Sequence, residues 1–245
     1  MVGIFISLSL SAYWCMNRFF SVLAKDVEGS QLVSNLLQVI AAFYSILLGF
    51  IIYANWQDLE TARDNVDDEA SAFASILQDS AVLPEEIRQE IKTVIGKYVV
   101  IIRTQEWEKL RTAEISPHAE DAIDDLYTVI QSFEPQTNRE QIFYAEIVQN
   151  LTSAFNGRRA RLAMAHNTFP IALSIMLIVG SLILTILTAS LGGLKNKAYH
   201  ALVNGALGGL LAFCLILVVQ LTHPFTGTVL INAAPFSEGT LGEFK

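Results

Sequence analysis

Four long apolar segments, separated into two pairs by a polar middle region, dominate the pattern of the chain. They cover residues 1–24, about 31–55, 171–194 and 198–222. A helix needs about 20 apolar residues to cross the hydrocarbon core of a bilayer, and each segment reaches that length. Because unpaired backbone groups cannot lie in lipid, each segment is predicted to be a transmembrane helix. The pattern predicts an all-α, polytopic membrane protein with four transmembrane helices in a 2+2 layout around an extramembrane helical bundle.

These segments divide the chain into four regions. Residues 1–55 hold the first and second transmembrane helices, 56–168 an acidic helical domain outside the membrane, 169–222 the third and fourth transmembrane helices, and 223–245 a tail. An even number of crossings places the domain and both termini on the same side of the membrane. The first segment is interpreted as a retained helix and not as a cleaved signal, because no charged residue precedes its apolar core.

The second apolar segment carries a polar or small stripe. Alternate steps of four and three residues, which follow one face of a helix, join Gln31, Asn35, Gln38, Ala42, Ser45, Gly49, Ile52 and Trp56. Polar groups that face hydrocarbon are costly, so this face is expected to contact protein or water. Two interpretations stay open: the stripe packs against neighbouring helices through small residues and interhelical hydrogen bonds, or it lines a water-filled pore.

Prolines and capping residues divide the middle region into helices. The second transmembrane helix is predicted to continue beyond the membrane, because no Pro or Gly follows Trp56 within it. Pro and capping residues mark the first turns of three further helices. The predicted helices are the continuation to about Asp79, Pro84 to about Lys109, Ser116-Pro117 to about Phe133, and a long helix opened by the capping box Thr137-Asn138-Arg139-Glu140.

The charges lie mainly in the middle region and are mainly acidic. Apolar residues make up 52% of the chain and charged residues 16%, and the segment 57–168 contains 20 acidic against 11 basic residues. An acidic domain lacks the basic surface that nucleic-acid binding requires. Asp64, Asp67 and Asp68 share one helical face just beyond the second transmembrane helix. They are predicted to attract cations in a vestibule, and a solvated helix surface is the alternative interpretation.

Motifs of catalysis are absent from the sequence. It has no His-Glu-x-x-His or Cys-x-x-Cys pair, no phosphate-binding Gly-rich loop after a strand and no nucleophile elbow. The chain is therefore predicted not to be an enzyme, with no catalytic residue, no metal site and no cofactor.

Several short motifs resemble those of one bacterial membrane-protein family. They are Phe43–Phe50, Trp56, Glu69-Ala70, Arg158–Leu162, and His223–Gly227 with Pro235-Phe236. Over nearly the whole chain these motifs resemble the bacterial bestrophin-like family. By analogy with bestrophins, the resemblance implies a pentameric ion channel with four membrane helices per subunit and a cytosolic helical region between the second and third. It also implies a pore lined by the second helix with an apolar constriction. The acidic run of the bestrophin calcium clasp has no counterpart after the last apolar segment.

The resemblance favours the pore interpretation of the stripe. Gln38, Ser45 and Gly49 then face water, and Ile52 with Tyr53 or Trp56 forms an apolar neck. The expected partners are inorganic ions, the lipid bilayer and further copies of the chain in a homo-oligomer, with a pentamer favoured, and the acidic domain favours cations. The expected location is the bacterial inner membrane, with the domain in the cytoplasm. The alternative function is a non-conducting scaffold or sensor whose helical domain binds a partner, and a small transporter comes third.

Overall fold

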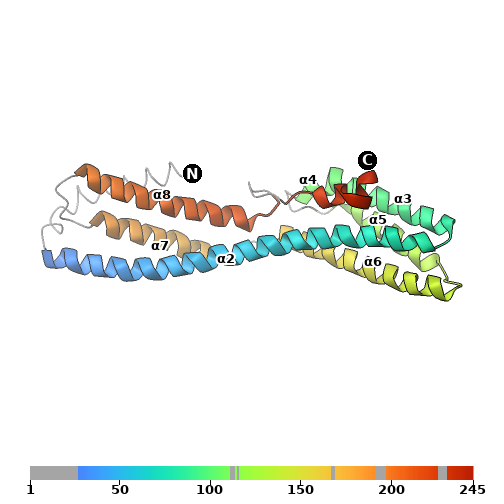
Figure 1. Cartoon of the computed structure of the whole chain (residues 1–245). Coiled ribbons are helices and arrows are strands. Elements are labelled where there is room, and N and C mark those ends of the chain that lie inside the picture. Colours follow the sequence, from blue (N-terminus) through green and yellow to red (C-terminus); the bar gives the residue numbers. More distant parts are fainter. Residues whose placement is uncertain are drawn as a thin grey trace. The chain divides into compact units, whose positions relative to one another are not determined.

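The computed structural model describes residues 27–110, 114, 116–166, 169–190, 197–225 and 231–244, and every regular element in these ranges is helical (Figure 1). The predicted first transmembrane segment, 1–24, lies outside the described residues. The α-helices are α2 (Val27–Asp79), α3 (Glu85–Ile101), α4 (Trp107–Leu110), α5 (Pro117–Ser132), α6 (Asn138–Ala165), α7 (Ile171–Ser190) and α8 (Lys197–Thr222). Shorter helical turns are η2 (Ser80–Val82), η3 (Ile102–Glu106), η4 (Ala234–Ser237) and η5 (Gly239–Glu243).

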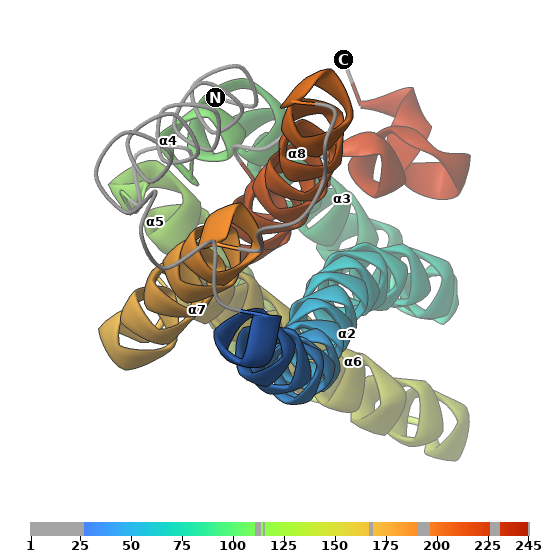
Figure 2. The ribbon, with the colours of Figure 1, turned by 90° about the vertical axis from the view of Figure 1, so that its left-hand side faces the viewer.

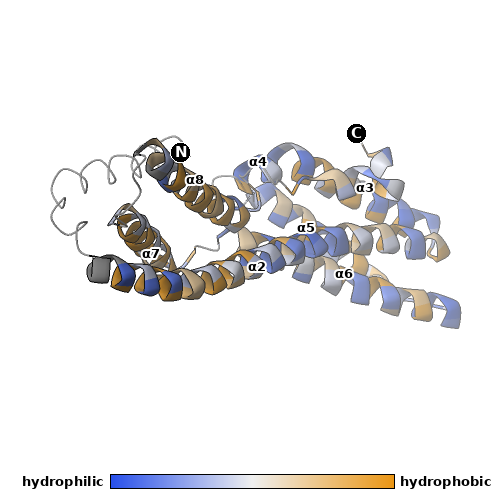
Figure 3. Cartoon of the chain, turned by 60° about the vertical axis from the view of Figure 1, so that its left-hand side comes forward, coloured by the Kyte–Doolittle hydropathy of each residue, from blue (hydrophilic) through white to orange (hydrophobic). Residues whose placement is uncertain are grey.

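The described residues form two compact units. The apolar unit comprises α7, α8 and residues 27–57 of α2, and the polar unit comprises the rest of α2, α3 to α6 and the segment from 223 onward. Figure 3 shows that α7 and α8 are hydrophobic along most of their length, whereas hydrophilic and hydrophobic residues alternate in the polar unit. α2 is one uninterrupted helix that contributes to both units, and its end at Asp79 agrees with the prediction.

Three helices of the apolar unit are long and apolar enough to cross a membrane. They are the first part of α2, α7 and α8, which coincide with the second, third and fourth predicted transmembrane segments. The three helices lie side by side (Figure 2). Their shared core consists of large apolar side chains from all three: Tyr44, Leu48, Ile51, Leu177, Leu184, Leu211 and Val218.

Tyr44 holds α2 against α7. Its hydroxyl donates to the carbonyl oxygen of Leu177 at 2.9 Å and lies 2.6 Å from Ser181 Oγ. The ring lies directly on the backbone of Gly180, where an added Cβ would overlap the ring carbons. The close approach of a polar aromatic residue to a glycine is therefore a specific contact between these two helices, in which the buried hydroxyl is satisfied.

Most helices of the polar unit begin and end close to the residues that the sequence predicts. α5 starts at Pro117. The capping box before α6 is confirmed: the amide of Glu140 donates to Thr137 Oγ1 and the amide of Thr137 donates to Glu140 Oε2, both at 3.1 Å. These reciprocal bonds satisfy two amides that the first turn of α6 would otherwise leave unpaired.

The predicted single helix from Pro84 to Lys109 is wrong in one respect. The chain runs through α3, then the π-helical turn η3, then α4. A π-turn holds more residues than an α-turn and therefore changes which residues of the helix face the core. Glu106, the last residue of η3, is completely buried in consequence.

The segment 231–244 packs on the polar unit. Ile231, Phe236 and Leu241 are buried. The ring of Phe236 lies 6.5 Å from the rings of both Tyr98 and Trp107, and Trp107 Nε1 donates to the carbonyl oxygen of Ile231 at 3.3 Å. These contacts make the end of the described chain a part of the polar unit's core.

Candidate functional site

The helix α2 has one face covered by its own unit and two faces that the described residues leave exposed. Tyr44, Leu48 and Ile51 form the covered face. Next to the covered face lies the polar stripe, and four of the residues predicted to line the pore are exposed on it: Gln38, Ser45, Gly49 and Trp56. Tyr53, the other candidate for the apolar neck, is also exposed but lies one position beyond this stripe. The hydroxyl of Ser45 is bonded within the helix, donating to the carbonyl oxygen of Ala41 at 2.6 Å.

Ile52, the predicted apolar neck residue, is positioned differently from the rest of the stripe. Its side chain is partly buried and packs against the core of the apolar unit. Ile52 therefore lies at the edge of the polar stripe, between the covered face of α2 and the exposed one.

A second uncovered stripe, adjacent to the first, is apolar. Its largest members are strongly exposed, with Phe43 at 77% and Phe50 at 70% of their surface. Such a continuous apolar surface is stable only when lipid or another protein surface covers it. The stripe consists of Leu32, Leu36, Val39, Phe43, Ile46, Phe50 and Tyr53.

The predicted vestibule residues are exposed on α2 in the polar unit. Asp64, Asp67 and Asp68 all lie at the surface, and they do not form a group that would hold a metal ion within one chain. Partial desolvation, with the neighbouring carboxylate of Asp64, raises the pKa of Asp67 above its ordinary value. The three side chains therefore form a concentrated negative surface on α2.

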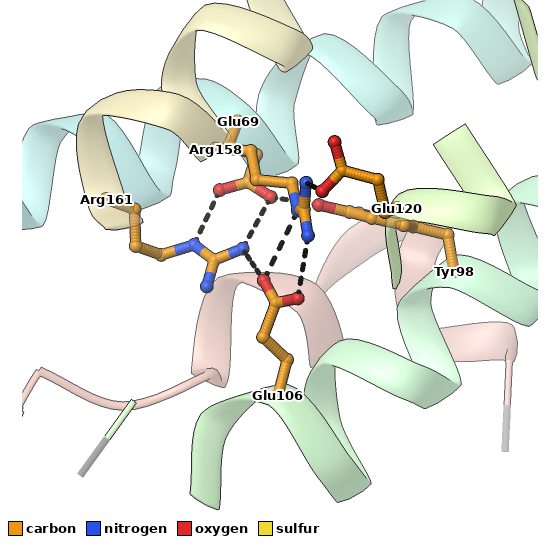
Figure 4. A network of polar contacts seen from close by, with 6 residues as sticks. All are labelled: Glu69, Tyr98, Glu106, Glu120, Arg158 and Arg161. Atoms are coloured by element: carbon orange, nitrogen blue, oxygen red, sulfur yellow. Dashed lines mark hydrogen bonds and ion pairs between the residues drawn. The ribbon is translucent and has the colours of Figure 1, made fainter. Parts of the chain in front are cut away.

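The polar unit also contains a buried network of charged side chains that the sequence analysis did not anticipate (Figure 4). At its centre the guanidinium of Arg161 donates to both oxygens of Glu69, from Nε at 2.7 Å and from Nη2 at 3.0 Å. Nη2 also donates to Glu106 Oε1 at 2.8 Å. Arg161, Glu69 and Glu106 are all completely buried. Two carboxylates from different helices thus share one guanidinium.

Arg158 and Glu120 extend the network beyond Arg161. Arg158 Nη2 donates to Glu106 Oε2 at 3.0 Å, and Nη1 donates to Glu120 Oε2 at 3.0 Å. The side chain of Glu120 is 54% exposed, whereas that of Arg158 is buried. The fully buried part therefore contains two arginines and two glutamates and is electrically neutral, and Glu120 connects it to solvent.

Tyr98 and Trp107 close the network on its aromatic side. The hydroxyl of Tyr98 donates to Glu69 Oε1, and the guanidinium of Arg161 lies 5.4 Å from the centre of the Trp107 ring. Burial and the adjacent carboxylate of Glu69 raise the pKa of Tyr98 well above its ordinary value, so the phenol keeps its proton and acts as a donor. Desolvation opposes the charge of Arg161, but the charge and hydrogen bonds of Glu69 outweigh it and raise the pKa of the guanidinium.

The network joins helices of the polar unit to one another. Its side chains come from α2, α3, η3, α5 and α6. Both carboxylates are fully engaged by guanidinium groups, which leaves neither as a free base.

A sequence model of the Bestrophin-like domain matches residues 3–236 of the chain. The chain belongs to the bestrophin-like family.

Membership of the bestrophin-like family confirms the resemblance drawn from the motifs of the sequence. A mutant bacterial bestrophin homolog from Klebsiella pneumoniae, solved as a crystal structure, has a similar fold. Its TM-score with this bestrophin-like chain is 0.72 at 12% sequence identity, and the alignment covers 95% of each chain. A search of curated proteins finds no match. The family and the fold therefore agree over nearly the whole length of the chain.

Proposed function

We propose that this bestrophin-like protein is an oligomeric ion channel of the bacterial inner membrane. Each subunit would contribute four transmembrane helices in the 2+2 layout, and the acidic domain would lie in the cytoplasm. The observation that carries the proposal is the uncovered face of α2, which is polar or small along Gln38, Ser45 and Gly49 although it belongs to a helix of transmembrane length. Membership of the family and the bestrophin-type fold support it.

The proposal requires several copies of the chain, because one helix cannot enclose a pore. In a cyclic homopentamer with α2 nearest the axis, each of the two exposed stripes of α2 would face surroundings that match its polarity. The polar stripe then faces water, and the adjacent apolar stripe, with Phe43 and Phe50, contacts neighbouring subunits and lipid. The non-conducting scaffold or sensor is the competing function, in which the polar stripe only packs helices together.

The test of the proposal uses Ile52, the large aliphatic residue on the polar stripe. An apolar ring excludes ions by destabilising the narrow water column, so Ile52→Ala is expected to raise ion flux into liposomes and Ile52→Ser to raise it further. If the side chain only packs, Ile52→Ala instead leaves a cavity that costs about 2–5 kcal/mol without a rise in flux. Flux of the purified protein is measured with an ion-sensitive dye inside the vesicles.

Leu48→Ala is the matched control for this test. Leu48 lies one turn earlier on the covered face of α2 and belongs to the core of the apolar unit, so its replacement is expected to lower stability and leave flux per assembled particle unchanged. Unchanged flux in assembled Ile52 variants would remove Ile52 from the pore. A parent protein that passes no ions at all would favour the scaffold or sensor.

The acidic surface beyond the membrane gives a second test, this time of selectivity. Replacing Asp64, Asp67 and Asp68 together by Asn is expected to reduce the preference for cations, because a ring of subunits multiplies each charge. Each exposed charge contributes at most about 1 kcal/mol to stability, so folding should change little. The reversal potential in asymmetric salt is the measurement. Because the pKa of Asp67 is raised, its carboxylate becomes protonated at a higher pH than that of an ordinary aspartate as the pH falls. Its contribution to the preference for cations is lost at the same point.

A control with the same number of removed charges separates a local effect from a change in net charge. Three exposed aspartates of α5 serve this purpose: Asp121, Asp124 and Asp125. Equal reversal potentials for the parent and the α2 triple variant would return these side chains to a solvated surface role.

A further inference from the structure

A notch on the surface of α3 holds one aromatic side chain of the same chain. The ring of Phe244 lies on the backbone of Gly96 so closely that a Cβ at position 96 would be 2.7 Å from its Cδ1 atom. Any other residue at this position would have to displace the ring. The absence of a side chain at Gly96 therefore creates the space that the ring of Phe244 fills.

Two cations beside Gly96 contact the polar groups of the same short segment. Lys92 Nζ lies 2.9 Å from Glu243 Oε2 and 5.9 Å from the centre of the Phe244 ring. Arg103 Nη1 donates to the carbonyl oxygen of Phe244 at 2.6 Å. The notch thus contacts the carboxylate of Glu243 and both the ring and the carbonyl group of Phe244.

The segment that carries this pair keeps its own shape through local contacts. The amide of Gly242 donates to the carbonyl oxygen of Glu238 at 3.2 Å, and the amide of Phe244 donates to that of Leu241 at 3.3 Å. Gly239 has a φ of 54°, which favours glycine. A segment that is ordered in this way loses little conformational entropy when it binds.

The contacts at the notch suit a reversible interaction. The side chains of Lys92 and Glu243 are 44% and 48% exposed, and an ion pair exposed to this extent contributes little net free energy. At the notch itself, most of the attraction on Glu243 and Phe244 must therefore come from one ring on a glycine backbone and one hydrogen bond to a carbonyl group, while the buried side chain of Leu241 holds the preceding turn on the polar unit. We propose that Lys92, Gly96 and Arg103 form a recognition site for a glutamate–phenylalanine pair, and that Glu243 with Phe244 is its releasable resident ligand.

The test uses a synthetic peptide with the sequence of residues 237–245 and the full-length protein in detergent. In the double variant Glu243→Gln/Phe244→Ala the site has lost its resident ligand, and ligand-observed NMR is expected to detect binding of the peptide. The parent protein should bind the same peptide at least about tenfold more weakly, because its own segment competes at an effective concentration in the millimolar range. Adding Gly96→Leu to the double variant fills the notch and should weaken binding at least about tenfold.

Variant peptides keep the test independent of how the protein variants fold. A peptide with Ala in place of the phenylalanine should bind at least about tenfold more weakly to the double variant, and one with Gln in place of the glutamate by no more than about fivefold, as for an exposed ion pair. The proposal is overturned if the double variant fails to bind the parent peptide, if the Ala peptide binds equally well, or if the parent protein binds as well as the double variant.

Discussion

Replacing Arg161 by Met is expected to destabilise the protein by about 3–5 kcal/mol, because it leaves the carboxylate of Glu69 buried without its main partner. Arg161 supplies both guanidinium bonds to Glu69 and one to Glu106, and all three residues are completely buried. For a chain of this size the midpoint of thermal unfolding should fall by roughly 10 °C. Circular dichroism of the protein in detergent micelles measures this shift.

Arg159→Met is the control on the same helix. Arg159 is exposed, and its guanidinium lies 5.1 Å from the centre of the Phe155 ring, so its loss should cost about 1 kcal/mol or less. Arg161→Lys should fall between the two, since Lys keeps the charge but cannot form the paired bonds of a guanidinium. Equal midpoints for Arg159→Met and Arg161→Met would show that the buried network does not stabilise the polar unit.

The helices of the polar unit were predictable because their boundaries depend on local signals. Pro117 opens α5, and Thr137 and Glu140 cap α6 through bonds between residues three positions apart. The π-turn that interrupts the predicted second helix had no such signal, since neither Pro nor Gly lies between Ile102 and Glu106. Its position agrees with a tertiary cause: at Glu106 the turn brings a carboxylate to two arginines of α6.

The buried charge network could not be predicted as a set of pairs from one sequence. Its central partners, Arg161 with Glu69 and Glu106, are 92 and 55 residues apart. A partial signal existed, because Glu69 continues the helical spacing of Val66 and Ala70, and these residues are buried. A carboxylate within an apolar stripe indicates a buried partner, but only the packing of α6 against α2 identifies which arginine.

The stripe on α2 shows where a helical pattern gives a face but not its environment. Spacing alone placed Gln38, Ser45 and Gly49 together, and in the structure all three are exposed on a face that the apolar unit leaves open. Spacing did not reveal that Ile52 lies at the edge of this face, partly against the core. Whether water, lipid or another subunit covers such a face depends on the assembly, and the sequence of one chain does not contain that information in its periodicity.

The contact between Tyr44 and Gly180 leads to the second large effect, in the apolar unit. Gly180→Ala is expected to cost about 1–3 kcal/mol, because the added methyl group overlaps the ring of Tyr44 and forces α2 and α7 apart. Displacing the ring also strains the hydrogen bonds of its hydroxyl with Leu177 and Ser181. Thermal unfolding in detergent should therefore begin at lower temperature than in the parent.

A second glycine and a compensating substitution separate this overlap from a general effect of losing a helical glycine. Gly205 on α8 has no atom within 4 Å of an added Cβ, so Gly205→Ala should leave stability unchanged or raise it. In a Tyr44→Leu background the ring is absent, and Gly180→Ala should then cost much less than it does in the parent, which is the non-additivity expected of residues in contact. If Gly180→Ala costs the same in both backgrounds, the ring of Tyr44 is not what requires glycine at position 180, and the spacing of α2 and α7 must be set by other contacts.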